Sequence, residues 1–414
     1  MAQIFPFQPY RYTAEAGPIA NLVTQPYDKI SHAMRERYLA LSPFNLVRII
    51  LGKPEPSDCA NENAYTRAAA HFKAWIEAGI LARDAGPALY AYFQEFNVPD
   101  TGERLVRKAF IGLGAVEDYS AGVVHRHEQT LTGPKKDRLE LLRHTRAHFG
   151  QIFMLYPDPE CAVDRVLDEA AAAAPLFSVT DEYGAVHTMW PIREPARIAA
   201  IQERMAPRKL LIADGHHRYE TALAFRDEHP DLPGARKVMM TFVNMHSPGL
   251  RILATHRVLH SLEGFQAEAF LARVQPAFSV RPLESAGALR QAWAEPHPES
   301  SRIGFLHRNG LVLLETRRDP RVPDVTVLHE KLLDGALGIT PEAVREQRFI
   351  RYVRGIDTAI EELRSGRAQA AFLLEPTPVE QVAAISFSGG VMPQKSTDFY
   401  PKLLSGLTIY RIGD

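Results

Sequence analysis

The chain has 414 residues, 46% of them hydrophobic and 23% charged, a composition typical of soluble globular proteins. Its 48 Lys and Arg residues almost balance its 49 Asp and Glu residues, so its net charge argues against a nucleic-acid partner or an anionic membrane surface. The length suffices for two or three domains. The two cysteines, Cys59 and Cys161, cannot build a disulfide framework or a CxxC metal site, which indicates a reducing compartment.

The sequence contains no recognisable targeting or membrane signal. The N-terminal MAQIFPFQPYRY lacks the basic region and apolar run of a signal peptide. The chain also has no apolar run of about eighteen residues, the length that would indicate a membrane-spanning helix. We therefore expect a cytoplasmic protein, and the sequence leaves its oligomeric state open.

The N-terminal part alternates between predicted strands and helices. The β-branched run NLVRIILG predicts a strand over 45–52. Apolar residues at helical spacing predict a helix over 62–81. Two strands joined by a turn are expected at 88–98 and 107–117. The segment 132–149 predicts a helix with a proline in its first turn.

The next elements lead to the most distinctive motif. An Ala-rich helix is expected at about 164–174, followed by a hairpin at 181–192. KLLIADGHHRYETAL, residues 209–223, then predicts a strand, a tight turn and a helix. A further hairpin is expected at 301–317. The pattern of predicted helices and strands changes near residue 262. We therefore predict an α+β protein with a catalytic core over 1–262 and a C-terminal α+β domain over 263–414.

The turn of this motif holds candidate anion-binding residues. Gly215 can adopt backbone angles closed to other residues, and a helix N-terminus offers N–H donors and partial positive charge. Cations are disfavoured there, so His217 and Arg218 in the first turn indicate a bound anion. In the alternative, Asp214 merely caps the helix and the basic residues are solvated. A zinc or iron site using the histidines is a third interpretation.

Other charged segments are weaker candidates. Asp28 lies in the proline-bounded turn TQPYDKIS and could be a turn former, a general base or a magnesium ligand. The segment 125–138 gathers His, Glu, Lys and Arg residues before a helix, including Glu128, Lys135 and Arg138. Lys395 and Lys402 lie in VMPQKSTDFYPK near the C-terminus. A P-loop, a nucleophile elbow and a GxGxxG fingerprint are all absent from the sequence.

Several motifs together resemble a bacterial and archaeal family of unknown function. They occur over nearly the whole chain, in the order VTQPYDKIS, PFNLVRIIL, HRHEQTLTGPKKDRLELL, IADGHHRYETAL, GLRILATHRVL and VMPQKSTDFYPKLLSGL. The GHHRY core is also similar to the phosphate-binding loop of the ParB/sulfiredoxin superfamily. Sulfiredoxins need a loop cysteine where this chain has His216, whereas the DGxHR loop of free-serine kinases matches Asp214, Gly215, His217 and Arg218.

This resemblance implies a ParB/sulfiredoxin-like core with large insertions and a C-terminal extension. It implies transfer of a phosphoryl group from ATP or ADP, with Mg²⁺, to a small hydroxyl substrate such as free L-serine. His217 and Arg218 would stabilise the transferring group, and Asp28 or Glu128 would serve as base, Asp28 being preferred. The expected phosphate-binding residues are Asp214, Gly215, His216, His217, Arg218 and Lys395. The expected substrate-binding residues are Arg48, Lys135 and Arg138. Asp214 would orient a histidine or ligate the metal.

Two other functions remain open at this stage. The first is a ParB-like nucleotide-binding regulatory protein associated with DNA. Against it stand the near-neutral charge and the lack of an evident helix-turn-helix. The second is a metal-dependent hydrolase that uses the histidines.

Overall fold

The computed structural model describes residues 1–99, 101–128 and 132–413, with only the backbone for 132–134. The chain divides into two compact units. Unit 1 comprises residues 1–126, 130–251 and 401–414, and unit 2 comprises 127–129 and 252–400. This division differs from the expected boundary near 262, because residues 255–259 form a strand inside the sheet of unit 2. The C-terminal residues return to unit 1.

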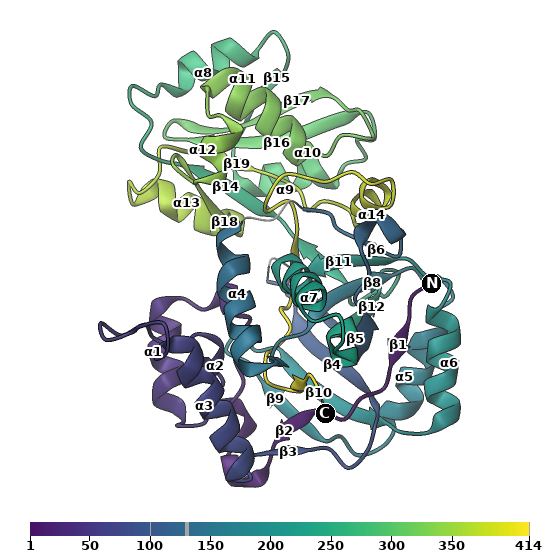
Figure 1. Ribbon diagram of the computed structural model, residues 1–414. Helices are drawn as coiled ribbons and strands as arrows, with labels where there is room; N and C mark the ends of the chain where they lie inside the picture. The colour runs from purple at the N-terminus through teal and green to yellow at the C-terminus, as the bar shows by residue number, and fades with distance from the viewer. Residues whose placement is uncertain (100, 129–131, 414) are drawn as a thin grey trace. The chain divides into compact units, whose positions relative to one another are not determined.

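A mixed sheet forms the centre of unit 1 (Figure 1). Within the described residues it has nine strands. In spatial order they are β6 (Val124–His125), β11 (Leu210–Asp214), β8 (Ile152–Tyr156), β12 (Lys237–Asn244), β5 (Arg104–Ala115), β4 (Leu89–Asn97), β10 (Val186–Ile192) and β9 (Phe177–Thr180), with β1 (Ile4–Phe5) beside β5. The predicted pair of strands β4–β5 is confirmed, although residue 100 lies outside the described part. The hairpin expected at 181–192 exists as β9–β10, but its first strand, β9, lies before the predicted range.

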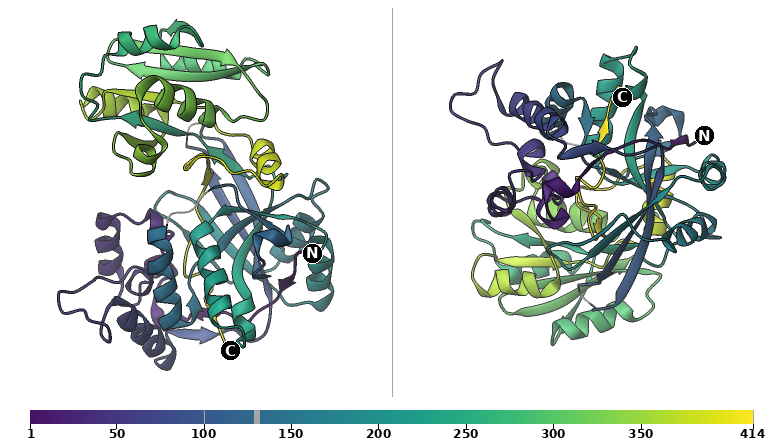
Figure 2. Two further views of the ribbon diagram at one scale, coloured as in Figure 1. Left: turned by 45° about the horizontal axis from the view of Figure 1, so that its top comes forward. Right: turned by 90° about the horizontal axis from the view of Figure 1, so that it is seen from below.

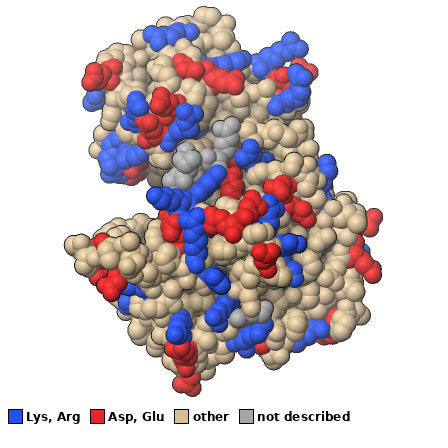
Figure 3. Space-filling view, in the orientation of Figure 1, with Lys and Arg blue, Asp and Glu red and all other residues tan. Residues whose placement is uncertain are grey.

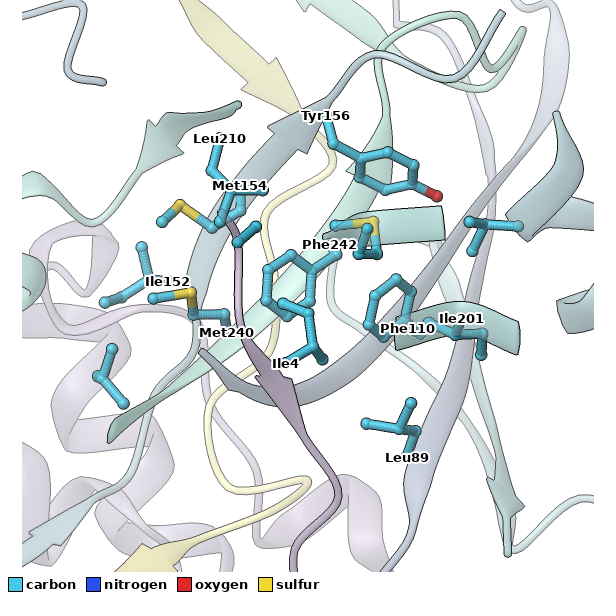
Figure 4. Packing of buried hydrophobic residues seen from close by; sticks show 14 of the residues in the cluster. Ile4, Leu89, Phe110, Ile152, Met154, Tyr156, Ile201, Leu210, Met240 and Phe242 are labelled. Atoms are coloured by element: carbon cyan, nitrogen blue, oxygen red, sulfur yellow. The ribbon is translucent and has the colours of Figure 1, made fainter. Parts of the chain in front are cut away.

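One face of this sheet is covered by three helices, α5 (Ala162–Ala171), α6 (Pro195–Met205) and α7 (His216–Glu228). Alternate residues of each strand point into this core, as the two-residue period of a strand requires. Examples are Ile152 and Met154 of β8 and Met240 and Phe242 of β12, which pack together as Figure 4 shows. The predicted helix of 164–174 corresponds to α5, and the predicted strand–turn–helix corresponds to β11 and α7.

A separate helical layer completes unit 1 (Figure 2). It contains α1 (His32–Leu41), α2 (Val47–Ile50), α3 (Ala64–Glu77) and α4 (Thr132–Thr145). The helices expected at 62–81 and 132–149 are confirmed as α3 and α4. Short pairings are β2 (Tyr10–Tyr12) with β3 (Leu81–Arg83) and β7 (Ala147–His148) with β21 (Tyr410–Arg411). Through the second pairing, the C-terminal segment 401–412 becomes an integral part of unit 1.

The predicted strand at NLVRIILG is wrong, because these residues contain helix α2. The Asn45 side chain accepts a hydrogen bond from the Val47 N–H at 2.9 Å and so begins the turn. Val47, Ile49 and Ile50 are then almost fully buried in unit 1. This burial outweighs the preference of β-branched residues for strands, which is a weak one.

Unit 2 is a six-stranded antiparallel sheet in the part that the structure describes, with helices on both faces (Figure 1). Its strands are, in spatial order, β15 (Ser279–Leu283), β17 (Gly310–Arg317), β16 (Ser300–His307), β19 (Ala370–Leu373), β14 (Thr255–Leu259) and β18 (Ile350–Arg354). One face packs on α8 (Ala267–Val274), α10 (Asp324–Val327), η6 (Leu328–Asp334), α11 (Gly335–Leu337) and α12 (Pro341–Arg345). The other packs on α9 (Ala286–Ala294) and α13 (Ile356–Arg364).

Three further elements of this part are α14 (Val379–Phe387), β13 (Arg251–Leu253) and β20 (Asp398–Tyr400). The predicted hairpin of 301–317 is confirmed as β16–β17. Its turn consists of Arg308 and Asn309, one residue earlier than Asn309–Gly310, because His307 pairs with Gly310. Among the described residues, no helix has both the length and the apolar character to span a membrane.

Candidate anion site in unit 1

Asp214 reaches its position through an irregularity at the end of β11. Ile212 pairs with Met154 of β8, but Asp214 pairs with Phe153, so Ala213 is an extra residue in β11. Such a bulge turns the following side chain to the opposite face of the sheet. Ile212 accordingly lies in the core under the helices, whereas Asp214 meets the C-terminal segment, where Lys402 Nζ is 2.9 Å from its Oδ2.

Gly215 makes the turn into α7 in a left-handed conformation, with φ +93°. This conformation favours glycine because it has no Cβ. A Cβ at this position would lie 3.0 Å from Arg218 Nε, so the glycine also gives room for the arginine. Gly150 does the same on another side, since its Cβ would lie 3.3 Å from Arg218 Nη1. Two glycines therefore create the space that Arg218 occupies.

Arg218 folds back over the turn. Its Nη2 is 3.3 Å from Asp214 Oδ1, and its Nη1 donates to the Gln151 carbonyl. The side chain is 15% exposed. A guanidinium has five N–H donors, so these two contacts fix the direction of Arg218 without using its full donor capacity.

Cations surround Asp214. Burial alone would raise the pKa of its carboxyl group, but Lys402, Arg218 and Lys29 together hold that pKa far below its ordinary value. Burial lowers the pKa of Arg107 to about 9, and the charge of Asp214 acts on Arg107 in the opposite direction. One carboxylate thus stands among four basic side chains at the N-terminal end of α7, an end that is itself positively polarised. The cluster carries excess positive charge.

A buried polar network fixes the segment that carries Lys402. Arg107 is completely buried, its Nε lies 2.9 Å from Gln94 Oε1, and its guanidinium donates to the Pro401 carbonyl. Gln94 Nε2 donates to the Lys402 carbonyl at 2.9 Å. Arg107 and Gln94, which both lie on strands of the sheet, therefore hold the backbone of residues 401–402. In this position the ammonium group of Lys402 points to Asp214.

The motif TQPYDKIS contributes to the same region of unit 1. Thr24 exchanges two backbone hydrogen bonds with Ser405, at 3.2 and 2.8 Å. Residues 27–29 form a short 3₁₀ helix, η3 (Tyr27–Lys29), which directs the charge of Lys29 at Asp214. Asp28 lies on this turn and is exposed. The motif TQPYDKIS, the motif around Asp214 and the C-terminal segment that carries Lys402 are distant in sequence, and they meet in unit 1.

The remaining predicted residues of unit 1 are placed as follows. His216 is buried, and His217 is half-buried with its carbonyl bound by the Thr221 hydroxyl at 2.7 Å. Arg138 stacks 4.1 Å from the Tyr27 ring and donates to the Ile50 carbonyl at 2.7 Å. Lys135 pairs with Glu220 of α7. Arg48 donates to the Leu39 carbonyl at 2.9 Å, where helix α1 ends. These contacts bring Arg138 near Arg218 and leave Arg48 in a contact with the backbone.

Two predicted residues belong to unit 2. Glu128 forms a bridge with Met392, and its charge acts on Arg257 and Tyr352. Lys395 is exposed and has a left-handed backbone, with φ 57°, and its carbonyl accepts from Arg257 at 3.0 Å. The structure therefore groups these two residues with each other, in a different unit from Asp214.

Sequence reasoning missed Lys29 and Arg107, and it named Lys402 only as a weak candidate near the C-terminus, not as a member of the cluster. Lys29 and Lys402 are part of motifs that carry the family resemblance, and this was the available signal. Arg107 lies in the middle of strand β5, where only its departure from the apolar pattern marks it.

Two cavities border unit 1 elements. A cavity of about 60 Å³ lies against Arg218 and is lined by Tyr27, Arg138, Phe149 and aliphatic residues. It is much smaller than pockets that enclose drug-sized ligands, roughly 300–1,000 Å³. A second cavity of about 240 Å³ is lined by Arg37, Tyr38, Asp181 and Glu182 and contains none of the predicted site residues.

The surroundings of Asp214 do not fit a magnesium site. Both carboxylate oxygens already contact cations, Arg218 and Lys402, and a divalent ion there would meet further repulsion. Within the described residues no group of three or more His, Cys, Asp or Glu side chains is arranged to hold a metal ion. On the face shown in Figure 3, basic and acidic side chains are interspersed.

Comparison with known proteins places the chain in a family. The chain belongs to the family described as "Protein of unknown function (DUF1015)", whose model matches residues 4–336. This confirms the resemblance to a family of unknown function, whereas the relation to the ParB/sulfiredoxin superfamily stays a prediction. The search of curated proteins gave no match.

Solved structures show only distant likeness. A free serine kinase in complex with AMP is 12% identical, with a TM-score of 0.38, and the match covers 69% of this chain and 89% of the kinase. A conserved hypothetical protein from Pyrococcus furiosus is 12% identical, with a TM-score of 0.36, covering 69% and 92%. A C-terminally truncated SbnI from Staphylococcus aureus is 12% identical, with a TM-score of 0.35, covering 72% and 87%. Likeness at this level transfers no activity.

Proposed function

We propose that unit 1 is a nucleotide-dependent phosphotransferase that acts on a small hydroxyl substrate, with free L-serine as the first candidate. The observation that carries this proposal is the excess positive charge around Asp214. Cations at a helix N-terminus cost roughly 0.3–1 kcal/mol each. A polyphosphate bound at the first turn of α7 would offset that cost and would use the donors of Arg218 and Lys402.

The residues would divide the work as follows. Gly215 lets the phosphate approach the backbone at the start of α7. Arg218 and Lys402 neutralise charge on the phosphoryl group as it moves between oxygens. Asp214 keeps these two cations aligned, with Arg218 Nη2 and Lys402 Nζ at 3.3 and 2.9 Å from its oxygens. His217, in the first turn, would donate to a phosphoryl oxygen.

The proposed step conserves atoms and charge. The substrate hydroxyl oxygen attacks the terminal phosphorus of ATP or ADP, and the bond from that phosphorus to the bridging oxygen breaks. The hydroxyl proton passes to a carboxylate, and ADP or AMP leaves. Magnesium would arrive with the nucleotide phosphates, which it commonly accompanies, since Asp214 is already occupied by cations.

Asp28 is the preferred base of the two candidates. It is exposed and adjoins Lys29, whose charge reaches Asp214. Glu128 belongs to unit 2. Arg138, beside Tyr27, is the basic residue best placed to receive a substrate carboxylate.

The test is transfer of phosphate to a defined acceptor. The protein is incubated with Mg²⁺, with ATP or ADP, and with L-serine, and the product is followed by phosphorus NMR. We expect O-phosphoserine from one of the two nucleotides. The variants Arg218→Gln and His217→Ala should reduce turnover by roughly 100-fold or more, as the loss of a transition-state donor does elsewhere.

Arg226→Gln is the matched control, because Arg226 lies in the last turn of the same helix and pairs with Asp118. Its turnover should equal that of the unchanged protein. The proposal fails if neither nucleotide transfers phosphate to serine or to other small hydroxyl compounds. It also fails if Arg218→Gln turns over at the normal rate.

A further inference from the structure

Unit 2 contains a polar cavity of its own. It has a volume of about 150 Å³. It lies at one end of the strands, where β14 begins and β17 and β19 end. The register of the strands explains why these ends meet, since Ser300 pairs with Arg317 and Gly304 pairs with Leu373. All residues that line the cavity belong to unit 2.

Arginines form the basic part of the cavity wall. Arg318 Nη2 lies 3.0 Å from Asp324 Oδ2, but its Nε is buried and has no hydrogen-bond partner among the described residues. A buried N–H without a partner is costly, particularly on a charged group. Arg257 is almost completely buried and donates to the carbonyl groups of Thr255 and Lys395. The guanidinium of Arg318 therefore gives this wall a positive group, with more donors than the one bound to Asp324.

Two carboxyl groups form the acidic part. Burial raises the pKa of Asp324 and that of Glu375, and the nearby Asp324 raises the pKa of Glu375 further. His297 Nε2 lies 2.8 Å from Glu375 Oε2. Desolvated carboxylates that repel each other are stabilised by a cation between them. This side of the wall is thus suited to a positive group.

Apolar residues complete the lining. Val325 and Leu374 are buried at the cavity, and Pro376 and Pro378 lie on the loop that follows β19. The volume corresponds to on the order of five water molecules, which is far too small for a nucleotide. The lining therefore combines a donor, an acidic pair and an apolar wall around a compact space.

We propose that this cavity binds a small zwitterion, an α-amino acid with a short apolar side chain such as alanine. Its carboxylate accepts from the Arg318 guanidinium, its ammonium group lies between Asp324 and Glu375, and its side chain contacts Val325 and Leu374. A simple anion would be repelled by the two acidic groups, and a simple cation would be repelled by Arg318. A ligand with both charges complements both parts of the wall.

The test uses three compounds with nearly the same skeleton: L-alanine, ethylamine and propionate. Binding to the full chain is measured by calorimetry and by the shift in thermal unfolding temperature. L-alanine should bind, whereas ethylamine, without the carboxylate, and propionate, without the ammonium group, should bind at least about tenfold more weakly. Equal binding of either single-charge compound, or no binding of L-alanine, L-serine or L-valine, overturns the proposal and leaves a water-filled cavity.

Variants separate this site from unit 1. Glu375→Gln and Arg318→Lys should each weaken L-alanine binding by about tenfold or more. Arg302→Gln is the matched control, since Arg302 pairs with Glu315 in the same unit, at 3.3 Å, outside the cavity. Because alanine has no hydroxyl group, its binding is independent of phosphate transfer, and Lys402→Gln should leave it unchanged. Unaltered affinity in both cavity variants would contradict the assignment.

Discussion

Asp214 and the four basic groups around it make a charge balance that is unusual for a protein interior. A carboxylate with two partners, Lys402 and Arg218, is a common arrangement. Here Lys29 and Arg107 act on the same carboxylate, so removal of its charge would take one interaction away from each of the four cations. Asp214 is therefore a positioning residue whose loss is felt by the whole cluster.

This leads to a prediction for Asp214→Asn. Breaking a buried pair by removal of one partner costs about 3–5 kcal/mol, and we expect the lower end because the Asp214 side chain is 18% exposed. The free energy of unfolding, measured by urea titration, should fall by that amount. Added tripolyphosphate should restore more stability to the variant than to the unchanged protein, because it supplies the missing negative charge.

Asp84 provides the comparison. It is a buried carboxylate of the same unit, with Arg11 at 3.2 Å and Arg193 at 2.9 Å. Asp84→Asn should also destabilise the protein, but tripolyphosphate should not rescue it. Equal rescue of both variants would mean that the effect is non-specific.

At the residue scale, the sequence predicted part of the cluster. Gly215 and Arg218 could be predicted because a glycine and cations at a helix start have a physical meaning within a few residues. Lys402 could not, since it is 188 residues from Asp214 and the two meet only through the folded C-terminal segment. The bulge at Ala213, which aims Asp214 at Lys402, has no signature in the apolar run LLIA.

At the element scale, the junction of β11 and α7 is the decisive feature. Its glycine has both a left-handed backbone and a close arginine, two separate reasons for having no side chain. Gly122, also in unit 1, has the same left-handed conformation, with φ 65° and ψ 19°, but nothing lies within 4 Å of its Cβ position. Comparison of these two glycines therefore separates the cost of the backbone conformation from the cost of a contact with Arg218.

We predict different outcomes for Gly215→Ala and Gly122→Ala. Each should lose roughly 1–2 kcal/mol from the left-handed conformation. Gly215→Ala should lose more, because the new Cβ would lie 3.0 Å from Arg218 Nε and 3.1 Å from its Cζ. Thermal unfolding of both variants and phosphate binding by calorimetry are the measurements. If the two variants lose equal stability and both keep phosphate binding, Arg218 has no tight contact with the turn.

Element types were predicted best where a local period exists. The hairpins β4–β5 and β16–β17 alternate or run apolar between turn residues, and the helices α3 and α5 repeat at helical spacing. Helix α2 was missed because four residues are too few to show a period, and its conformation depends on Asn45 and on burial.

At the scale of the molecule, the chain passes from unit 1 to unit 2 and back twice. The last return brings residues 401–412, of which Leu403, Leu404, Leu407 and Ile409 are buried in unit 1. The pattern of predicted elements assigned this segment to the C-terminal domain. Periodicity reports local structure only and carries no information about a partner hundreds of residues away.

Removal of residues 401–414 should therefore destabilise unit 1 while unit 2 retains its structure. Unit 1 would lose the pairing of β21 with β7, its buried leucines and Lys402. Trp75 and Trp190 lie in unit 1 and Trp293 in unit 2. Hydrogen exchange resolved by peptide should show loss of protection in β8 and β12 and unchanged protection in β16 and β19.

Lys402→Gln keeps the segment and removes only its charge, so protection in β8 and β12 should persist in that variant. Loss of protection across unit 2 in the truncated chain would show that the two units do not fold independently.

The return of the C-terminal segment also sets an order of assembly during synthesis. Lys402 leaves the ribosome after every residue of unit 2, although its partner Asp214 was made almost two hundred residues earlier. Domains fold as units while the chain emerges. Unit 2 can therefore fold before unit 1 has received its last strand, β21. A nascent chain therefore cannot form the complete cationic cluster until translation has passed residue 402.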